Sequence, residues 1–227
     1  MNTPQIDIGG QYSHCLHPSN FRHLPAPAKY GNLDTKWMLM VASMIFLNTK
    51  IKDVYQLHER WMGGDINPTS GTTYIFYLEE IAYWIRRNCD NLISLSYICE
   101  RFKSFLRDQG ELPSKIGIDC IAGLLSSPES HPLRRIYKSN ESLLLKINNI
   151  SNACKHSFVN SDLFVSGLHE PHLFAIALDR NNFNKEVVPE FISLSEVVSE
   201  FNKFLEVANL HLDSWPKPSE WRKHGID

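Results

Sequence analysis

Long stretches of apolar residues at helical spacing constrain the fold of this chain more than any other feature. Between residues 74 and 107, apolar side chains recur every three or four positions, which is the period of an amphipathic helix. The same period marks residues 34–47, 51–62, 116–125, 131–158 and 193–208. It is weakest near residues 88–91, so residues 74–107 form either two helices or one kinked helix. Each helix of this kind buries one face, so we expect an all-α protein, a helical bundle of about six helices.

Residues 163–178 depart from this helical pattern. Two short segments there, Leu163–Gly167 and Leu173–Leu178, are rich in Phe, Val, Ile and Leu and are separated by a proline-containing turn. Short apolar segments on both sides of a turn predict a β-hairpin. We therefore expect one small hairpin near residues 163–178, and a polar loop over residues 179–190.

Proline content divides the chain into three parts. Residues 1–33 are rich in Pro, His, Gly and Asn and cannot form a continuous helix, so they predict an extended N-terminal arm. Residues 34–212 contain the helical segments and the hairpin, and predict a single helical domain. Residues 213–227 are again interrupted by proline and predict a C-terminal tail. With 227 residues and 43% hydrophobic content, the chain suits one large domain.

Charge and cysteine usage exclude several classes of protein. The net charge of −2 is not that of a generally basic nucleic-acid binder, so RNA binding requires a local basic patch. No apolar run reaches the roughly 18 residues that span a bilayer, and we expect no membrane association. The five cysteines are scattered and contain no C-x-x-C pair. We expect a cytoplasmic protein with reduced thiols, no metal site and no cofactor.

Polar side chains gather at one end of the segment 131–158. On a helical wheel of about 100° per residue, Asn149, Asn152 and His156 fall on one face, opposite the apolar stripe, with Lys155 on its flank. An imidazole acts as a general acid or base near neutral pH, and an ammonium stabilises charge on a phosphate. These residue types suit metal-independent RNA cleavage. They are equally common on the solvated face of an ordinary helix.

The sequence SNACKH at residues 151–156 resembles the signature of the HEPN superfamily, all-α domains of prokaryotic toxins and defence systems. That signature is an arginine, a polar residue, three variable residues and a histidine. Ser151 stands at the arginine position, Asn152 at the polar position and His156 at the histidine position. The resemblance covers about residues 35–210. It implies a bacterial toxin or antiphage-defence protein that acts on RNA, in which active sites form between two protomers of a homodimer.

The missing arginine leaves the activity open. A serine cannot replace a guanidinium, which stays charged and binds phosphate through two donors. Either Lys155, Lys146 or an arginine from elsewhere supplies the charge, or the domain does not cleave RNA. In the first hypothesis the protein is an endoribonuclease, with His156 as acid or base, Asn152 as positioning group and Lys155 as charge donor.

Two other functions stay open beside the first. The protein is then either a catalytically inactive scaffold that dimerises or binds a protein partner, or a small-molecule sensor. For RNA or another ligand, the candidate binding residues are Lys146, Asn149 and Ser151, which lie on the same segment as the signature.

A second basic segment lies in the long helical run. Tyr83 and Trp84 precede Arg86 and Arg87, with Ile85 between the two pairs. Alternating aromatic and basic residues can stack bases and contact phosphates. The same pattern also describes a helix whose apolar face is in the core and whose basic face is solvated.

Overall fold

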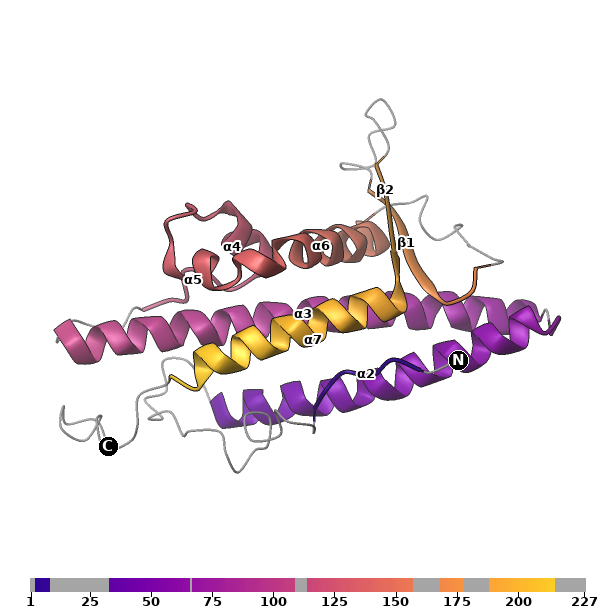
Figure 1. The fold of residues 1–227 in the computed structure, drawn as a ribbon, viewed down its shortest axis with the longest axis horizontal. Coiled ribbons are helices and arrows are strands. Elements are labelled where there is room, and N and C mark those ends of the chain that lie inside the picture. Colours follow the sequence, from indigo (N-terminus) through magenta and orange to yellow (C-terminus); the bar gives the residue numbers. More distant parts are fainter. Residues whose placement is uncertain are drawn as a thin grey trace. The chain divides into compact units, whose positions relative to one another are not determined.

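The computed structural model describes residues 3–8, 33–65, 67–108, 114–156, 168–177 and 188–214. In chain order its elements are α2 (Leu33–Met62), α3 (Pro68–Asp108), α4 (Ile121–Ser126), α5 (Pro132–Ile136), the 3-10 helix η3 (Lys138–Asn140), α6 (Glu141–His156), β1 (His172–Ala177), β2 (Val188–Ser193) and α7 (Leu194–Leu212) (Figure 1). The described residues thus form six α-helices and one two-stranded sheet, which confirms the predicted fold class. Within these residues, no helix has the length and hydrophobicity to cross a membrane.

The helix α2 is continuous where the sequence predicted two helices. The predicted break covers residues 48–50 and begins with Asn48, a residue type that often caps helices by bonding to the nearby backbone. Here the Asn48 side chain bonds elsewhere: its Oδ1 accepts from the Ile6 backbone N–H at 2.7 Å, and its Nδ2 donates to the Ile6 carbonyl at 3.0 Å. The amide therefore anchors the N-terminal residues and leaves the helix intact.

The helix α3 is also continuous, so the second break that we considered, near residues 88–91, is absent. Asn67 caps its start, since the Asn67 Oδ1 accepts from the Thr69 N–H at 2.9 Å, and Pro68 occupies the first turn. Asn88 lies buried in the middle of α3, where its Oδ1 accepts a hydrogen bond from Ser43 at 2.8 Å. A partner on another helix thus satisfies the amide oxygen without interrupting α3.

The predicted long helix over residues 131–158 is wrong in its first part. It is divided into α5, η3 and α6, and the helical path is interrupted at Tyr137. The Tyr137 ring is fully buried, and its hydroxyl lies 2.5 Å from the Ser96 Oγ. Ser139 and Asn140 follow, and both residue types favour helix ends over helix interiors. The helix expected at residues 116–125 is shorter than predicted and is α4.

The hairpin is formed by other residues than the sequence predicted. The second predicted strand corresponds to β1, but its antiparallel partner is β2, which pairs Phe174 with Phe191 and Ala175 with Glu190. The first half of β2 lies in residues 179–190, where the sequence predicts a polar loop. Residues 163–167, the other predicted strand, lie outside the described residues. The sheet packs one face on α6, as Figure 1 illustrates.

The start of α7 agrees with the sequence. Ser193 Oγ accepts from the Glu196 backbone N–H at 3.1 Å, which is the N-cap bond expected of a serine three residues before a glutamate. Most of the predicted arm, residues 9–32, and all but the first two residues of the predicted tail lie outside the described residues. The domain boundaries at 33 and 213 stay predictions.

The chain forms two compact units, each with its own buried residues. The first comprises Met1–Ile6, Ile45–Arg87 and Asn140–Asn202, and the second comprises Asp7–Met44, Asn88–Ser139 and Lys203–Asp227. The core of the first unit includes Leu47, Ile51, Val54, Ile81, Ile85, Leu144, Ile147, Leu173, Ala175, Val198 and Phe201. The core of the second includes Trp37, Met40, Leu92, Cys99, Phe102, Ile121, Tyr137, Phe204 and Ala208.

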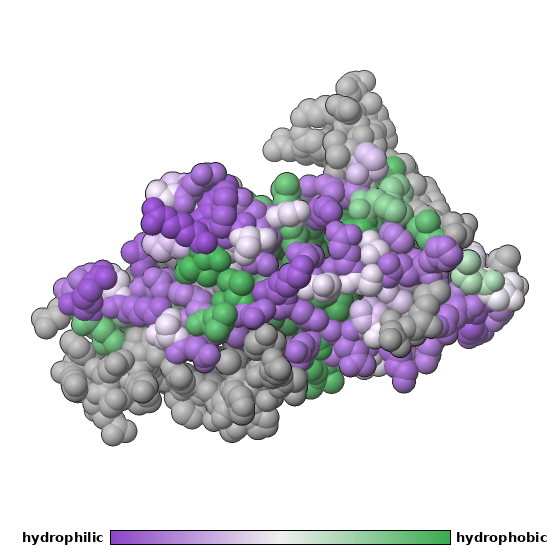
Figure 2. Space-filling view, in the orientation of Figure 1, coloured by the Kyte–Doolittle hydropathy of each residue, from purple (hydrophilic) through white to green (hydrophobic). Residues whose placement is uncertain are grey.

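The hairpin of the first unit exposes apolar surface on the side away from α6. Leu173, Ala175 and Ile192 are buried, whereas Phe191 is 46% exposed. His172 stacks on Phe191 with ring centroids 4.5 Å apart. Figure 2 shows this apolar surface over β1 and β2, among the polar residues that cover most of the visible helices.

Candidate nucleic-acid interface

The polar residues of α6 differ in exposure, and Ser151 lies on its buried face. Leu144, Ile147 and Ser151 are spaced three and four residues apart and are all buried, with Ser151 only 1% exposed. The Ser151 Oγ has no hydrogen-bond partner. The residue at the position of the signature arginine therefore faces the core of the first unit and is closed to a dissolved ligand.

Two other predicted binding residues hold α6 against its neighbours. The Asn149 Nδ2 donates to the Glu190 Oε1 of β2 at 2.7 Å. The Lys146 Nζ lies 3.6 Å from the Glu196 Oε1 at the start of α7. Both contacts join α6 to the elements that follow it in the chain. They give Lys146 and Asn149 a role in positioning the helix.

The last turn of α6 presents the remaining predicted residues to solvent. Asn152 is half-buried, and Lys155 and His156 are exposed. The Lys155 Nζ lies over the ring of Tyr83, 4.6 Å from its centroid. An ammonium at this distance is attracted by the electron-rich face of the ring. This contact joins the signature helix to the basic and aromatic segment of α3, which the sequence marked separately.

A second cation, Arg87, lies on the same face of α3 as Tyr83. Arg87 is exposed and follows Tyr83 by four residues, so the two side chains are neighbours on one face of α3. Trp84 supports the tyrosine from within: its ring meets Tyr83 edge-on at 5.4 Å and Phe46 of α2 at 6.5 Å. Arg86 differs from Arg87, because its Nε is buried. We call Tyr83, Arg87, Asn152, Lys155 and His156 the basic–aromatic surface.

A hydroxyl cluster fixes the segment that leads into the hairpin. The Tyr55 hydroxyl of α2 donates to the Glu170 Oε2 at 2.9 Å. Burial raises the pKa of the Tyr55 hydroxyl, and the hydrogen bond to Glu170 adds to the shift. Burial opposes ionisation of Glu170, but hydrogen bonds from Ser195, Tyr55 and Ser193 outweigh it and lower the pKa of this carboxyl. The carboxylate thus joins α2 to the end of β2 and the start of α7.

A buried histidine extends this attachment. His58 of α2 is 6% exposed, and its Nε2 lies 3.0 Å from the Leu168 carbonyl oxygen. Because a carbonyl only accepts, the Nε2 carries the proton, and the Nδ1 then accepts from the Tyr74 hydroxyl at 3.3 Å. With both ring nitrogens engaged, His58 has a structural role.

The structure brings together only part of the predicted site. Asn152, Lys155 and His156 share the last turn of α6, whereas Ser151 is buried and Lys146 and Asn149 contact acidic residues. The contact of Glu190 with Asn149 of α6 was not predictable, because the sequence predicts a loop at Glu190. The described residues contain no group of three or more His, Cys, Asp or Glu side chains suited to a metal ion.

Comparison with protein-family models, curated proteins and solved structures finds no match for this chain. The resemblance to the HEPN superfamily therefore stays a prediction from the sequence.

Proposed function

We propose that this protein binds single-stranded RNA through the basic–aromatic surface, as a HEPN-like domain of a bacterial toxin or antiphage-defence system. The observation that carries the proposal is the contact of Lys155 with Tyr83, beside the exposed Arg87. It places two cations and an aromatic ring within one area of the first unit. Cations contact phosphates and aromatic rings stack on bases, which is how proteins hold single strands without strict sequence preference.

The low net charge agrees with a local site. A chain with a net charge of −2 gains little from long-range attraction to RNA, so its affinity must come from a few direct phosphate contacts. Lys155 and Arg87 supply two of them. Asn152, half-buried one turn before His156, supplies an amide that can position a ribose hydroxyl or a phosphate oxygen.

Cleavage of the bound RNA is a separate step in the proposal. His156 is exposed at the end of α6, where its imidazole can accept the proton of a ribose 2′-OH that attacks the adjacent phosphodiester. The bond between phosphorus and the 5′-oxygen of the next nucleotide breaks, which gives a 2′,3′-cyclic phosphate, and the departing 5′-oxygen takes its proton from water. Lys155 stabilises the charge that develops on the phosphate. Ser151 takes no part, because it is buried.

Binding is tested by fluorescence anisotropy with a labelled single-stranded RNA at low salt. We expect the double variant Lys155→Ala/Arg87→Ala to bind at least about tenfold more weakly, and Tyr83→Leu to lose a further stacking contact of about 1–3 kcal/mol. The matched control is Lys36→Ala/Lys52→Ala, which removes two exposed lysines of α2 and so the same charge. Equal loss in both double variants would contradict a local site.

Cleavage is tested on the same RNA by gel electrophoresis. We expect wild-type cleavage to disappear in His156→Ala while binding is retained. Cleavage that persists in this variant overturns the catalytic role of His156 and leaves the binding proposal intact.

A second function, a scaffold that dimerises without catalysis, is favoured by the exposed apolar side of the hairpin, where Phe191 is 46% exposed and stacks on His172. Sedimentation of the wild type and of Phe191→Ser distinguishes this function. A dimer that dissociates in the variant supports it, and a monomeric wild type contradicts it.

A further inference from the structure

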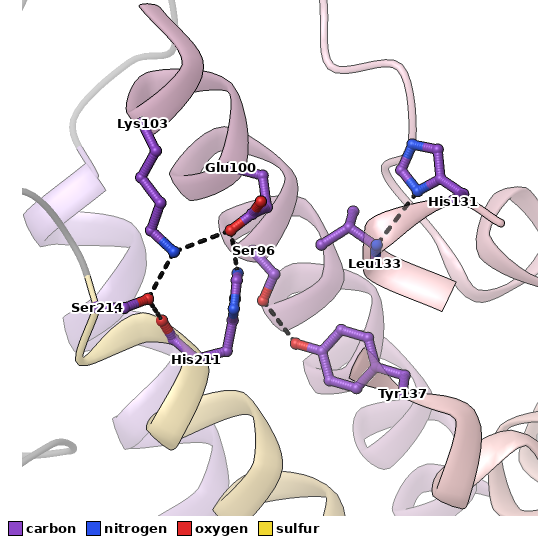
Figure 3. Close-up of polar contacts among 8 residues, drawn as sticks. All are labelled: Ser96, Glu100, Lys103, His131, Leu133, Tyr137, His211 and Ser214. Carbon is purple, nitrogen blue, oxygen red and sulfur yellow. Dashed lines mark hydrogen bonds and ion pairs between the residues drawn. The ribbon is translucent and has the colours of Figure 1, made fainter. Parts of the chain in front are cut away.

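The second unit contains a polar cluster that the proposed function does not use. It joins Glu100 and Lys103 of α3 to His211 and Ser214 at the end of α7 (Figure 3). We call these four residues the Glu100 cluster. The Lys103 Nζ lies 2.9 Å from the Glu100 Oε1 and donates to the Ser214 Oγ at 2.6 Å.

Histidine and lysine meet the same carboxylate oxygen. The His211 Nε2 lies 3.4 Å from the Glu100 Oε1, and the His211 side chain is only 9% exposed. The Nε2 makes no hydrogen bond of good geometry at this distance. Glu100 is thus already paired with Lys103, and the His211 imidazole fills the space beside that pair.

The cluster holds the last turn of α7. The Ser214 Oγ donates to the His211 carbonyl oxygen, which is one of the carbonyls left without a helical partner at the end of a helix. The Ser214 N–H bonds to the same carbonyl at 3.1 Å, and the Asp213 N–H bonds to the Asn209 carbonyl at 2.8 Å. Lys103 binds the hydroxyl that caps this turn, so α3 fixes the end of α7.

We propose that the Glu100 cluster is a pH-sensitive latch, which holds the last turn of α7 on α3 at neutral pH and releases it when His211 is protonated. A charged imidazole would be buried beside the Lys103 ammonium, with one carboxylate shared between two cations. Release exposes the ring to water and separates the two positive charges.

The electrostatic surroundings of His211 agree with this direction. Burial lowers the pKa of His211, and the charge of Lys103 lowers it further, while Glu100 and a hydrogen bond with the Ser96 backbone oppose the shift. The nearby Cys99 thiol carries no charge, because burial raises its pKa to about 12. A folded-state pKa below the ordinary value of 6.5 means that the latch is complete above that pH and weakens as pH falls below it.

The test is hydrogen exchange of the whole chain by NMR between about pH 7.5 and about pH 5.5, expressed as protection relative to the free amide at each pH. We expect protection of the Asp213 and Ser214 amides to fall about three- to tenfold in wild type, and to change little with pH in His211→Gln. The control His131→Gln removes another histidine of the second unit, and keeps the wild-type fall at these amides.

A second measurement does not depend on how well His211→Gln folds. The imidazole of His211 is titrated by NMR in Lys103→Met and in Glu100→Gln. We expect the midpoint to rise in Lys103→Met, which loses a repelling charge, and to fall in Glu100→Gln, which loses an attracting one. The latch is overturned if the pKa of His211 in the wild type is at or above its ordinary value of 6.5. It is also overturned if protection of the Asp213 and Ser214 amides stays constant across the pH range.

Discussion

A lysine and a histidine come together in two regions of this protein, and their surroundings give them different tasks. At the basic–aromatic surface, Lys155 and His156 are exposed, and Lys155 lies over a tyrosine ring. In the Glu100 cluster, Lys103 and His211 meet one carboxylate, and the His211 side chain is 9% exposed. The residue types are the same, so exposure decides whether they face a dissolved ligand or hold two helices together.

The contrast between exposed and buried polar residues would fail most clearly if Ser151, on the buried face of α6, were open to solvent. We expect Ser151→Arg, which puts an arginine where the HEPN signature has one, to destabilise the protein by about 3–5 kcal/mol, because the guanidinium would be buried without a counter-charge. Urea denaturation measures the loss. Asn152→Arg, at the next and half-buried position, is the control and should cost less than about 1 kcal/mol. A stable Ser151→Arg protein would show that this position faces solvent.

The salt dependence of RNA binding tests whether the exposed cations Lys155 and Arg87 contact phosphate and Lys103 does not. Each phosphate contact on a single strand contributes about 0.7 to the slope of log affinity against log salt. We therefore expect Lys155→Ala/Arg87→Ala to lower that slope by about 1.4, corresponding to two lost contacts. Lys103→Ala, from the Glu100 cluster, should leave the slope unchanged. An equal change in Lys103→Ala would mean that the two regions do not differ in the way described above.

A buried polar side chain without a hydrogen-bond partner provides a third environment for comparison. Asn209 of α7 is 2% exposed, and neither its Oδ1 nor its Nδ2 has a hydrogen-bond partner. Because an unsatisfied buried polar group costs about 1–3 kcal/mol, Asn209→Leu should raise the free energy of unfolding by about 1–2 kcal/mol. Asn202→Leu is the control and should be destabilising, since the Asn202 Nδ2 donates to the Gln5 carbonyl at 2.9 Å. A destabilised Asn209→Leu would show that this amide has a partner in solution.

The smallest effect concerns the hydroxyl cluster at the hairpin. Removing the Tyr55 hydroxyl in Tyr55→Phe should cost about 1 kcal/mol, because the Glu170 carboxylate loses a donor. Since the pKa of Glu170 is lowered in the folded protein, its contribution is complete above the ordinary value of 4.5 and is lost as pH falls below it. Urea midpoints measured from about pH 6 to about pH 3 should fall less steeply in Glu170→Gln than in wild type. Parallel curves would contradict this role of Glu170.

The sequence predicts where the candidate site lies, but not which of the polar residues of α6 are exposed there. The helical wheel placed Asn152 and His156 opposite the apolar stripe, and the structure leaves the first half-buried and the second exposed. Ser151 is buried because it follows Leu144 by seven residues and Ile147 by four, on the edge of that stripe. The wheel treats such an edge position as polar, and only packing against neighbouring elements decides which way it faces.

The sequence by itself determined the helical class of this protein, the start of α7 at Ser193 and the strand β1, because these depend on periodicity and on neighbouring residues. Only the tertiary structure decided that α2 and α3 run without a break, that β2 pairs with β1, and that Lys155 lies over Tyr83. Each of these depends on a partner distant in the sequence: Ile6 for Asn48, Ser43 for Asn88, Phe191 for Phe174 and Tyr83 for Lys155. Local propensity contains no information about such partners, so long-range packing overrides it where the two disagree.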